Sequence, residues 1–445
     1  MNKTFYSFPF LFLVLFLFMS RVAGAQSNDI SPYSRYGIGD LQDQSSALNL
    51  SMGGTGIAYH NDANPPFFIN LKNPASYAYA FIPVQDSAGK GGLKMATFEA
   101  GLTDNILNIS SGGQTAQSNN TYLSYLALNI PVSKHLGLGM GLTPVSTEGY
   151  NISTNSTIDT NTVQNTYQGT GGVEKVFLGA AYAFGKNKNL SIGVNASYQF
   201  GNLTNGEQVI FPLNVPAFNT FKTENLGVHA FTFDFGMMYT TKLWNDWSLT
   251  LGGIFVPTLN LDANYTLFTV TQYNATTSTV DTIQDSGRVG KVKIPLKFGC
   301  GITIKKGDHF TFSLDYTKQY WSQYSYFGQS EGLIDSYTYG VGIQYVANKD
   351  YARNYWQRIQ YRMGFSYGQN YLNIDNTPFV DKNVSFGLGL PLGPTNPFDH
   401  PAILNLAVQV GTMGTTSNNL LLQNYVKIMV GITFDDHWFD KRKFQ

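Results

Sequence analysis

The residues in this sequence with the clearest capacity for chemistry are basic side chains at alternating positions. Lys291, Lys293 and Lys297 share one parity of a single segment. Because successive side chains of a β-strand point to opposite sides, residues of one parity line one face of the strand. A basic face of this kind would attract a carboxylate ligand, or would pair with carboxylates elsewhere in the chain. Strand parity predicts a shared inner face for Lys291, Lys293, Lys297, Arg358, Arg362, Lys427, Glu99, Asp234 and Asp315.

Patterns for catalysis and metal binding do not appear in the sequence. The histidines are scattered without the spacing of metal ligands. There is neither a Gly-x-Ser-x-Gly elbow nor a phosphate-binding Gly-x-x-x-x-Gly-Lys loop. The net charge of zero gives no attraction to nucleic acid. We therefore expect no enzyme, no cofactor, no metal and no nucleic-acid partner, while a catalytic site assembled from distant residues stays open.

The composition favours a large antiparallel sheet over soluble enzyme domains. Charged residues make up 13% of the 445 residues and aromatic residues 15%, whereas soluble proteins carry about 25% charged residues. Residues 1–25 have the form of a secretory signal, with Lys3, an apolar run and the small residues Ala23-Gly24-Ala25 before the cleavage point. An uncleaved anchor helix is the alternative. No later stretch holds the roughly 20 apolar residues of a membrane-spanning helix.

From about residue 94 the chain alternates apolar residues with polar or small ones. In 231–239, for example, Phe231, Phe233 and Phe235 alternate with polar or small residues. A soluble β-sandwich also alternates, but roughly 100 residues suffice for it. Because the pattern persists over about 350 residues, it predicts an all-β fold, a transmembrane antiparallel β-barrel whose apolar faces meet lipid. The expected location is the outer membrane of a Gram-negative-type bacterium.

Fourteen segments carry this pattern, and an even count closes such a barrel with both termini on one side. The connections between them are alternately short and long, with the longest at 145–172, 202–226 and 259–289. Outer-membrane barrels have short periplasmic turns and long outer loops in the same way. The segments are 94–104, 120–131, 135–144, 173–184, 189–201, 227–241, 246–258, 290–304, 309–317, 336–347, 356–367, 384–391, 402–411 and 422–434.

The segment ahead of the strands, residues 26–90, is compact, irregular and half apolar. Fourteen strands enclose more space than side chains alone fill. We therefore expect 26–90 to plug the lumen from the periplasmic side, 91–436 to form the barrel, and 437–445 to be a periplasmic tail. Within the plug, Phe67, Phe68 and Ile69 are the candidate contacts for an apolar ligand.

This segment contains three short motifs in order: Met52-Gly53-Gly54-Thr55-Gly56-Ile57-Ala58, Asp62-Ala63-Asn64 and Asn73-Pro74-Ala75. Together they resemble the N-terminal signature of the FadL family. The resemblance covers about 30 residues, and Asn64-Pro65-Pro66-Phe67-Phe68 departs from it as an insertion. PorV-type barrels of the type IX secretion system have a similar signature. What the resemblance implies is a fourteen-stranded outer-membrane transporter of long-chain fatty acids or other hydrophobic compounds, with release sideways through a gap in the wall. The signature residues are Gly53, Gly54, Gly56, Asp62, Asn73, Pro74 and Ala75.

A candidate for such a lateral gap is the segment 135–144, with Gly137, Gly139, Gly141 and Pro144. Pro144 cannot donate a hydrogen bond to the strand ladder. A bulge that adjusts the curvature of the barrel explains the same residues. The inner charges have two readings as well, since they either hold the plug or draw in the head group of a ligand.

Two functions follow from these expectations. The first is passive uptake of hydrophobic or amphipathic, fatty-acid-like small molecules, with lateral release through the wall. The second is a PorV-like barrel that binds a protein partner within an outer-membrane secretion or assembly complex. A small-solute porin is a third possibility, which the plug disfavours. The expected partners are outer-membrane lipid, a hydrophobic or amphipathic ligand and, in the second function, an outer-membrane protein.

Overall fold

The computed structural model describes residues 31–60, 68–82, 93–273, 280–347, 354–392 and 402–437. The secretory signal expected at 1–25 lies outside these residues. The tail expected at 437–445 also lies outside them, apart from His437, the last residue of a strand.

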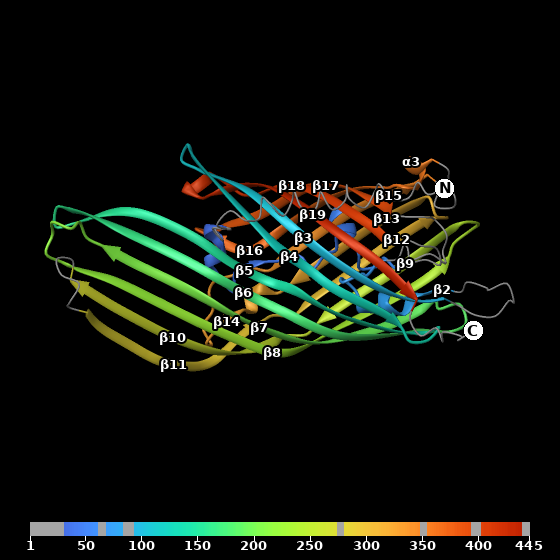
Figure 1. The fold of residues 1–445 in the computed structure, drawn as a ribbon, viewed down its shortest axis with the longest axis horizontal. Coiled ribbons are helices and arrows are strands. Elements are labelled where there is room, and N and C mark those ends of the chain that lie inside the picture. Colours follow the sequence, from blue (N-terminus) through green and yellow to red (C-terminus); the bar gives the residue numbers. More distant parts are fainter. Residues whose placement is uncertain are drawn as a thin grey trace, which may run out of the picture.

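A single antiparallel sheet closes on itself to form the barrel (Figure 1). The last strand, β19, pairs with the first wall strand, β3, from Leu422 opposite Ser110 to His437 opposite Met95. Two wall strands are each interrupted at a proline, because Pro257 lies between β9 and β10 and Pro295 lies between β11 and β12. Counted as continuous strands, the wall has fourteen members, and the predicted fold class is confirmed.

The wall strands follow one another in chain order. Their bounds are β3 (Leu93–Ser111), β4 (Gln114–Pro131), β5 (Leu136–Ile158), β6 (Asn161–Phe184), β7 (Leu190–Ile210), β8 (Phe218–Lys242), β9 (Trp247–Val256), β10 (Leu259–Tyr273), β11 (Val280–Ile294), β12 (Lys297–Lys306), β13 (Phe310–Gln319), β15 (Ser336–Val346), β16 (Gln360–Ile374), β17 (Thr377–Leu392), β18 (Ala402–Gly414) and β19 (Leu422–His437).

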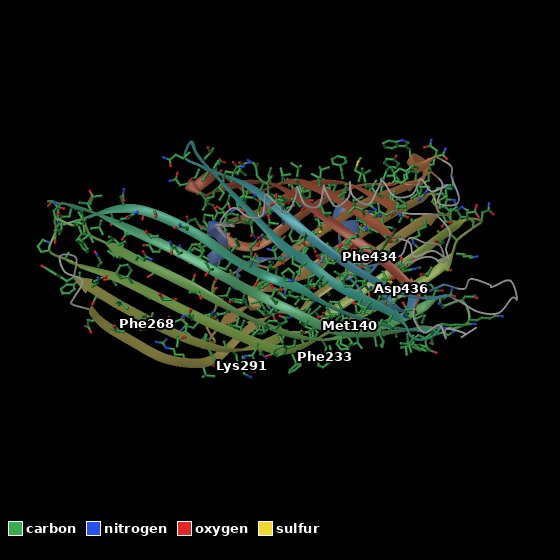
Figure 2. All side chains as sticks on the ribbon, viewed as in Figure 1. Met140, Phe233, Phe268, Lys291, Phe434 and Asp436 are labelled. Carbon is green, nitrogen blue, oxygen red and sulfur yellow. The ribbon has the colours of Figure 1, made fainter. Side chains whose placement is uncertain are left out.

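Most wall strands carry a row of exposed apolar side chains on their outer face. On β8, Phe231 and Phe233 are exposed, whereas Thr232 between them is buried. Phe233 projects from the outer surface of the barrel in Figure 2. Because these apolar rows have no protein neighbour on the outside, lipid is the environment that satisfies them. The protein is an outer-membrane barrel, as expected.

Six strands, β5 to β8, β10 and β11, reach beyond the rest of the wall at one end (Figure 1). We call this part the outer extension and define it as residues 148–171, 203–226, 265–273 and 280–288, whose ends nearest the rest of the wall lie at a common level, where Glu148 pairs with Gly171, Leu203 with Leu226 and Tyr265 with Arg288. The sequence predicted long loops at nearly the same positions. The described residues there form strands instead, apart from 159–160 and 211–217. Polar residues are frequent on both faces of these strands, so no clear apolar alternation marks them in the sequence.

The N-terminal segment lies inside the ring of wall strands (Figure 1). It consists of η1 (Pro32–Arg35), β1 (Asp40–Leu41), α2 (Ala47–Ser51), η2 (Pro74–Tyr79) and β2 (Phe81–Ile82). All five residues of α2 are buried, although a helix of this length has no stability of its own. The wall therefore supplies the packing that holds the segment in shape.

The remaining elements are short. They are η3 (Trp321–Gln323), β14 (Ser325–Tyr326), α3 (Tyr355–Arg358) and η4 (Ser417–Asn419). Within the described part of the chain, no helix is long and apolar enough to cross a membrane.

An apolar cluster fills the barrel near the outer extension. Tyr33 and Ile38 of the N-terminal segment pack there with Trp321, Tyr371 and Phe379 of the wall and its loops. The ring of Trp321 stacks on that of Tyr371 with centroids 4.7 Å apart. The cluster therefore occupies part of the lumen.

Candidate functional site

The glycine-rich part of the N-terminal segment forms a tight turn against the inner wall. Gly53 and Gly54 have φ angles of +67° and +74°, which glycine adopts without strain. A Cβ atom on Gly53 would lie 2.6 Å from the carbonyl oxygens of Val341 and Phe365. Glycine therefore lets the chain reverse direction while touching the backbones of β15 and β16.

Asp315 of β13 binds the end of this turn. Its Oδ2 atom accepts hydrogen bonds from the backbone N–H groups of Gly56, at 2.7 Å, and Ile57, at 2.8 Å. Asp315 is buried, and hydrogen bonds from N–H groups to a carboxylate are among the strong ones in proteins. Asp315, which strand parity predicts on the inner face, thus binds Gly56 of the N-terminal signature.

The Asn-Pro-Ala motif begins η2 and locks it to the turn. Asn73 accepts a hydrogen bond from the N–H of Ala75 at 3.0 Å and donates one to the carbonyl of Ile57 at 2.7 Å. Pro74 rests on Gly193 of β7, where a Cβ atom would come within 2.4 Å of the Pro74 carbonyl carbon. Asp62, the remaining signature residue, lies outside the described residues.

Glu99 of β3 holds the chain just ahead of η2. It accepts hydrogen bonds from the N–H of Ile69 at 2.9 Å and from the hydroxyl of Tyr125 at 3.0 Å. Phe68 and Ile69 are buried, and neither lines the two cavities described below. Their geometry favours an anchoring role over the ligand contact proposed from the sequence, and Phe67 lies outside the described residues.

Three of the expected inner basic residues face the lumen. Arg362 is buried and donates hydrogen bonds of 2.8 Å each to Gln344 and Asn405, so it ties neighbouring strands together. Lys297 and Lys427 face open space instead. The structure shows no hydrogen bond or ion pair for either of these lysines among the residues that it describes.

The inward placement predicted for Lys291, Lys293 and Arg358 is wrong. Val292 is fully buried and Lys291 is exposed, and Lys291 points away from the barrel in Figure 2. Because Pro295 interrupts the strand, the parity changes between β11 and β12, and only Lys297 faces inward. Arg358 lies on α3, before β16 begins at Gln360, with its guanidinium 5.6 Å from the Tyr355 ring.

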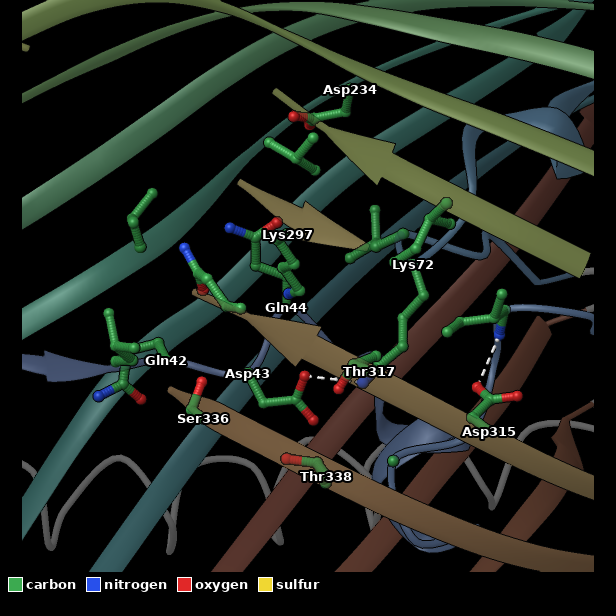
Figure 3. Close-up of a pocket in the computed structure, with 18 of the residues that line it drawn as sticks. Gln42, Asp43, Gln44, Lys72, Asp234, Lys297, Asp315, Thr317, Ser336 and Thr338 are labelled. Atoms are coloured by element: carbon green, nitrogen blue, oxygen red, sulfur yellow. Dashed lines mark hydrogen bonds and ion pairs between the residues drawn. The ribbon is translucent and has the colours of Figure 1, made fainter. Parts of the chain in front are cut away.

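A cavity of about 400 Å³ lies between the outer apolar cluster and the glycine turn. Asp43 forms an ion pair with Lys72 at 2.8 Å that faces this cavity (Figure 3). A second ion pair, between Asp234 and Lys175 at 3.3 Å, also faces it. Half of the Asp43 side chain is exposed, and this residue lines the cavity. Five lysines and four aspartates line the cavity, so its charge is nearly balanced.

The wall has a seam between β4 and β5. The two strands pair only from Leu126 opposite Leu142 to Pro131 opposite Gly137. Toward the outside, residues 114–125 of β4 pair with β3 alone, while β5 continues along β6. A second cavity, of about 160 Å³, lies in this seam and is lined by Tyr122, Leu123, Leu142, Pro144, Thr147 and Glu174.

Gln42 of the N-terminal segment bridges the seam from inside. Its N–H donates to the carbonyl of Val145 at 2.9 Å, and its Nε2 donates to the hydroxyl of Thr147 at 2.8 Å. On the other side, the hydroxyl of Tyr122 donates to its Oε1 at 2.9 Å. Tyr122 lines both cavities, so the contact between Gln42 and Tyr122 separates the central space from the seam.

Of the four residues proposed for a lateral gap, only Pro144 lines the seam cavity. It lies next to a register shift in the pairing of β5 with β6, so the bulge considered as the alternative is also present. Gly137 and Gly139 serve close packing, because Cβ atoms there would lie 1.9 Å and 2.7 Å from atoms of Tyr77. Gly141 faces Leu126 and Phe177 in the same way.

Sequence reasoning missed Gln42, Tyr122 and Lys175. Lys175 has the parity of buried Val173 and Phe177 on β6, so strand alternation would have identified it. Gln42 follows a strand of only two residues, which has no periodicity that a sequence could reveal.

One carboxyl group of the outer extension has an altered pKa. Burial raises the pKa of Glu148 on β5 to about 8, opposed by a hydrogen bond from Asn205. Glu148 lies next to Tyr150, whose hydroxyl donates to Asn205 at 2.5 Å. The shift favours the neutral form of this carboxyl group.

Comparison with known proteins adds a family and a fold. The model of a family described as BamG matches residues 7–445. The toluene transporter TodX of Pseudomonas putida has a solved structure that is 15% identical, with a TM-score of 0.57 over 89% of this chain and 100% of that one. A FadL homologue of Pseudomonas aeruginosa is 11% identical, with a TM-score of 0.54 over 88% and 98% of the two chains.

The toluene transporter TbuX of Ralstonia pickettii is 14% identical, with a TM-score of 0.51 over 87% and 97%. No curated protein matches the chain. The expectation of a FadL-like outer-membrane barrel is confirmed by these structures.

Proposed function

The chain belongs to the BamG family, and from this membership and the geometry above we propose that it is a plugged outer-membrane channel for passive uptake of hydrophobic or amphipathic small molecules. In this proposal the N-terminal segment is the plug, the central cavity receives the ligand, and release is lateral through the seam between β4 and β5. The protein performs no chemical conversion.

The observation that carries the proposal is the seam itself. Strand pairing stops at Leu126 and Leu142, although both strands continue outward. Unpaired backbone groups cannot face lipid at low cost. We therefore expect the unpaired stretch between β4 and β5 to serve a function. The cavity in the seam and the central cavity meet at Tyr122, which gives a ligand a short way out.

The ligand class rests on the comparisons and on the lining. Proteins of the same fold are described as transporters of toluene and as a channel for monoaromatic hydrocarbons. The central cavity here is more polar than such ligands need, since lysines and aspartates surround it. An amphipathic molecule, fatty-acid-like and with an anionic head, fits this lining better. Lys297 and Lys427 are the candidate groups for that head, because the described residues give neither of them a hydrogen bond or an ion pair.

A cross-link across the seam tests lateral release. Leu123→Cys on β4 and Pro144→Cys on β5 both place thiols in the seam cavity, and Cys300→Ser removes the exposed native thiol. Intact cells lacking their own copy of the protein would express the variant and be given radiolabelled dodecanoate, before and after treatment with a short bifunctional maleimide.

We expect the cross-link to abolish uptake, while each single-cysteine variant stays active after the same treatment. Equal uptake by cross-linked and untreated protein would contradict the lateral route. Uptake no faster with the wild-type protein than without it would contradict the uptake function as a whole.

A second candidate function is binding of a protein partner in an outer-membrane assembly or secretion complex. The family name BamG hints at such a partner, and the outer extension is a structural feature that uptake does not require. This candidate predicts a stoichiometric partner in gently extracted membranes, whatever the outcome of the uptake assay.

A further inference from the structure

We propose that the outer edge of β5, residues 150–158, accepts an extended segment of a partner protein as an added β-strand. The proposal goes beyond uptake and gives the second candidate function a defined surface. It rests on strand pairing in the outer extension and on the residues that the two edges of this extension carry.

The outer extension is a sheet with two open edges. Its strand order runs from β5 through β6, β7, β8 and β10 to β11. Within the described residues, 150–158 of β5 pair only with β6, and 280–291 of β11 pair only with β10. An open edge presents unpaired N–H and C=O groups, to which another chain can add a strand.

The two edges differ in their protection against such pairing. Natural edges are blunted by charged residues, prolines or bulges. The β11 edge carries Asp281, Arg288 and Lys291, and its pairing with β10 is irregular near Arg288. The β5 edge reads Tyr-Asn-Ile-Ser-Thr-Asn-Ser-Thr-Ile, without a charge or a proline. This edge is therefore the one left open for a strand.

The same edge already takes a strand from its own chain lower down. β1 pairs with it antiparallel, Asp40 opposite Thr147 and Leu41 opposite Ser146. Just above, the N–H of Ser31 donates to the carbonyl of Gly149 at 2.9 Å, and the N–H of Gly149 donates to the hydroxyl of Ser34 at 3.1 Å. The proposed site continues a strand addition that the structure shows.

These contacts also identify which backbone groups are free. Gly149 turns its N–H and C=O away from β6, and backbone direction alternates along a strand. The same groups of Asn151, Ser153, Asn155 and Thr157 therefore face the open edge. Their side chains are exposed, so a partner strand meets no steric barrier. Recognition would be by main-chain hydrogen bonds, the mode known as β-augmentation.

Proline substitutions at these positions test the open edge without removing the hydrogen bonds that hold β5 to β6. Ser153→Pro with Asn155→Pro removes two edge-facing N–H groups and leaves the ladder to β6, because the N–H groups that face β6 belong to the residues between them. The matched control is Val289→Pro on the other edge. The carbonyl of Lys291 accepts from the N–H of Phe327, so the backbone groups of Lys291 face away from β10, and those of residue 289, which has the same parity, do so as well. Correct folding of each variant is checked by its mobility on a gel without heating.

Two measurements use the full-length protein. Hydrogen–deuterium exchange compares residues 150–158 in native outer-membrane vesicles and in purified protein, and we expect exchange about tenfold slower in the vesicles. A photo-cross-linking residue at Thr154 should join one contiguous segment of one other protein, and the double proline variant should lose this product while Val289→Pro keeps it.

Equal exchange rates in vesicles and in purified protein would overturn the proposal. Cross-links to a second copy of this chain, or to the residues ahead of Ser31, would also overturn it, because the occupant would then not be a partner protein. None of these outcomes depends on uptake, since residues 150–158 line neither cavity.

Discussion

The hydroxyl of Tyr122 on β4 donates a hydrogen bond of 2.9 Å to the side-chain carbonyl of Gln42 in the N-terminal segment. Because the same glutamine also bonds to Val145 and Thr147 on β5, one side chain joins two wall strands that do not pair with each other at this level. The seam is therefore closed by the N-terminal segment and not by the wall.

Gln42→Ala should open the seam. The substitution removes the side-chain hydrogen bonds to Tyr122 and Thr147, each of which contributes about 1 kcal/mol. We expect faster uptake of radiolabelled dodecanoate by cells and a free energy of unfolding lower by about 1–2 kcal/mol. Gln114→Ala, at an exposed position of the same wall strand as Tyr122, is the control and should change neither. Slower uptake in the Gln42 variant would contradict the role of this contact as a barrier.

Asp315→Ala should loosen the N-terminal segment without unfolding the barrel. The buried N–H groups of Gly56 and Ile57 would lose their acceptor, at a cost of about 1–3 kcal/mol for each unsatisfied group. Limited proteolysis should then cut the segment 31–60 in the variant and spare it in the wild type. Asp335→Ala is the control, because Asp335 accepts hydrogen bonds from Ser322 in an outer loop.

Gly53→Ala should be among the most damaging single changes in the N-terminal segment. Its φ of +67° strains any other residue, and the added Cβ would press on the carbonyl oxygens of two wall strands. Gly112→Ala is the matched control, with a φ of +55° and no atom near its Cβ position. We expect the control to lose about 1 kcal/mol and the Gly53 variant at least twice as much, as measured by denaturant unfolding.

The sequence revealed the barrel because lipid and lumen impose opposite polarity on neighbouring residues. That rule placed Glu99, Asp234, Asp315, Lys297, Arg362 and Lys427 on the inner face, where the structure also has them. It was wrong for Lys291 and Lys293, since an interruption at Pro295 reverses parity and leaves no mark other than the proline itself. The same rule predicted loops where the outer extension forms strands. Strands that face water on both sides do not alternate apolar and polar residues.

The closure of the seam was beyond sequence reasoning for a different reason. Gln42 and Tyr122 are 80 residues apart and meet only because the barrel brings them together. Gly137 and Gly139 were read as signs of a gap, whereas they make room for Tyr77 of η2. A glycine in a strand shows that something approaches closely, and the sequence does not say what it is.

Glu148 makes the stability of the outer extension depend on pH. Burial raises its pKa to about 8 from an ordinary 4.5. The stabilising effect of the neutral carboxyl is complete below pH 4.5 and is lost as pH rises through 8. Hydrogen exchange of residues 148–171 should therefore accelerate as pH rises from about 5 to 8 and should level off above pH 8, after correction for the intrinsic pH dependence of exchange. Glu148→Gln, which cannot ionise, should remove this acceleration, and its persistence in that variant would contradict the assignment.

The two unpaired lysines of the central cavity offer a test of the ligand class. Lys297 and Lys427 face the cavity, and the described residues give neither of them a hydrogen-bond or ion-pair partner. Lys297→Gln with Lys427→Gln should weaken binding of octanoate to the purified protein in lipid nanodiscs about tenfold, since hydrogen bonds to charged groups contribute about 1.5–3 kcal/mol. Binding of octanol, which has no charge, should not change. Lys291→Gln is the control, because Lys291 points away from the barrel. The Lys291→Gln variant should bind octanoate as the wild type does.

If the double variant binds octanoate with unchanged affinity, the cavity does not recognise an anionic head group. The choice of an amphipathic acid as ligand is then wrong, even if uptake of a neutral compound is observed.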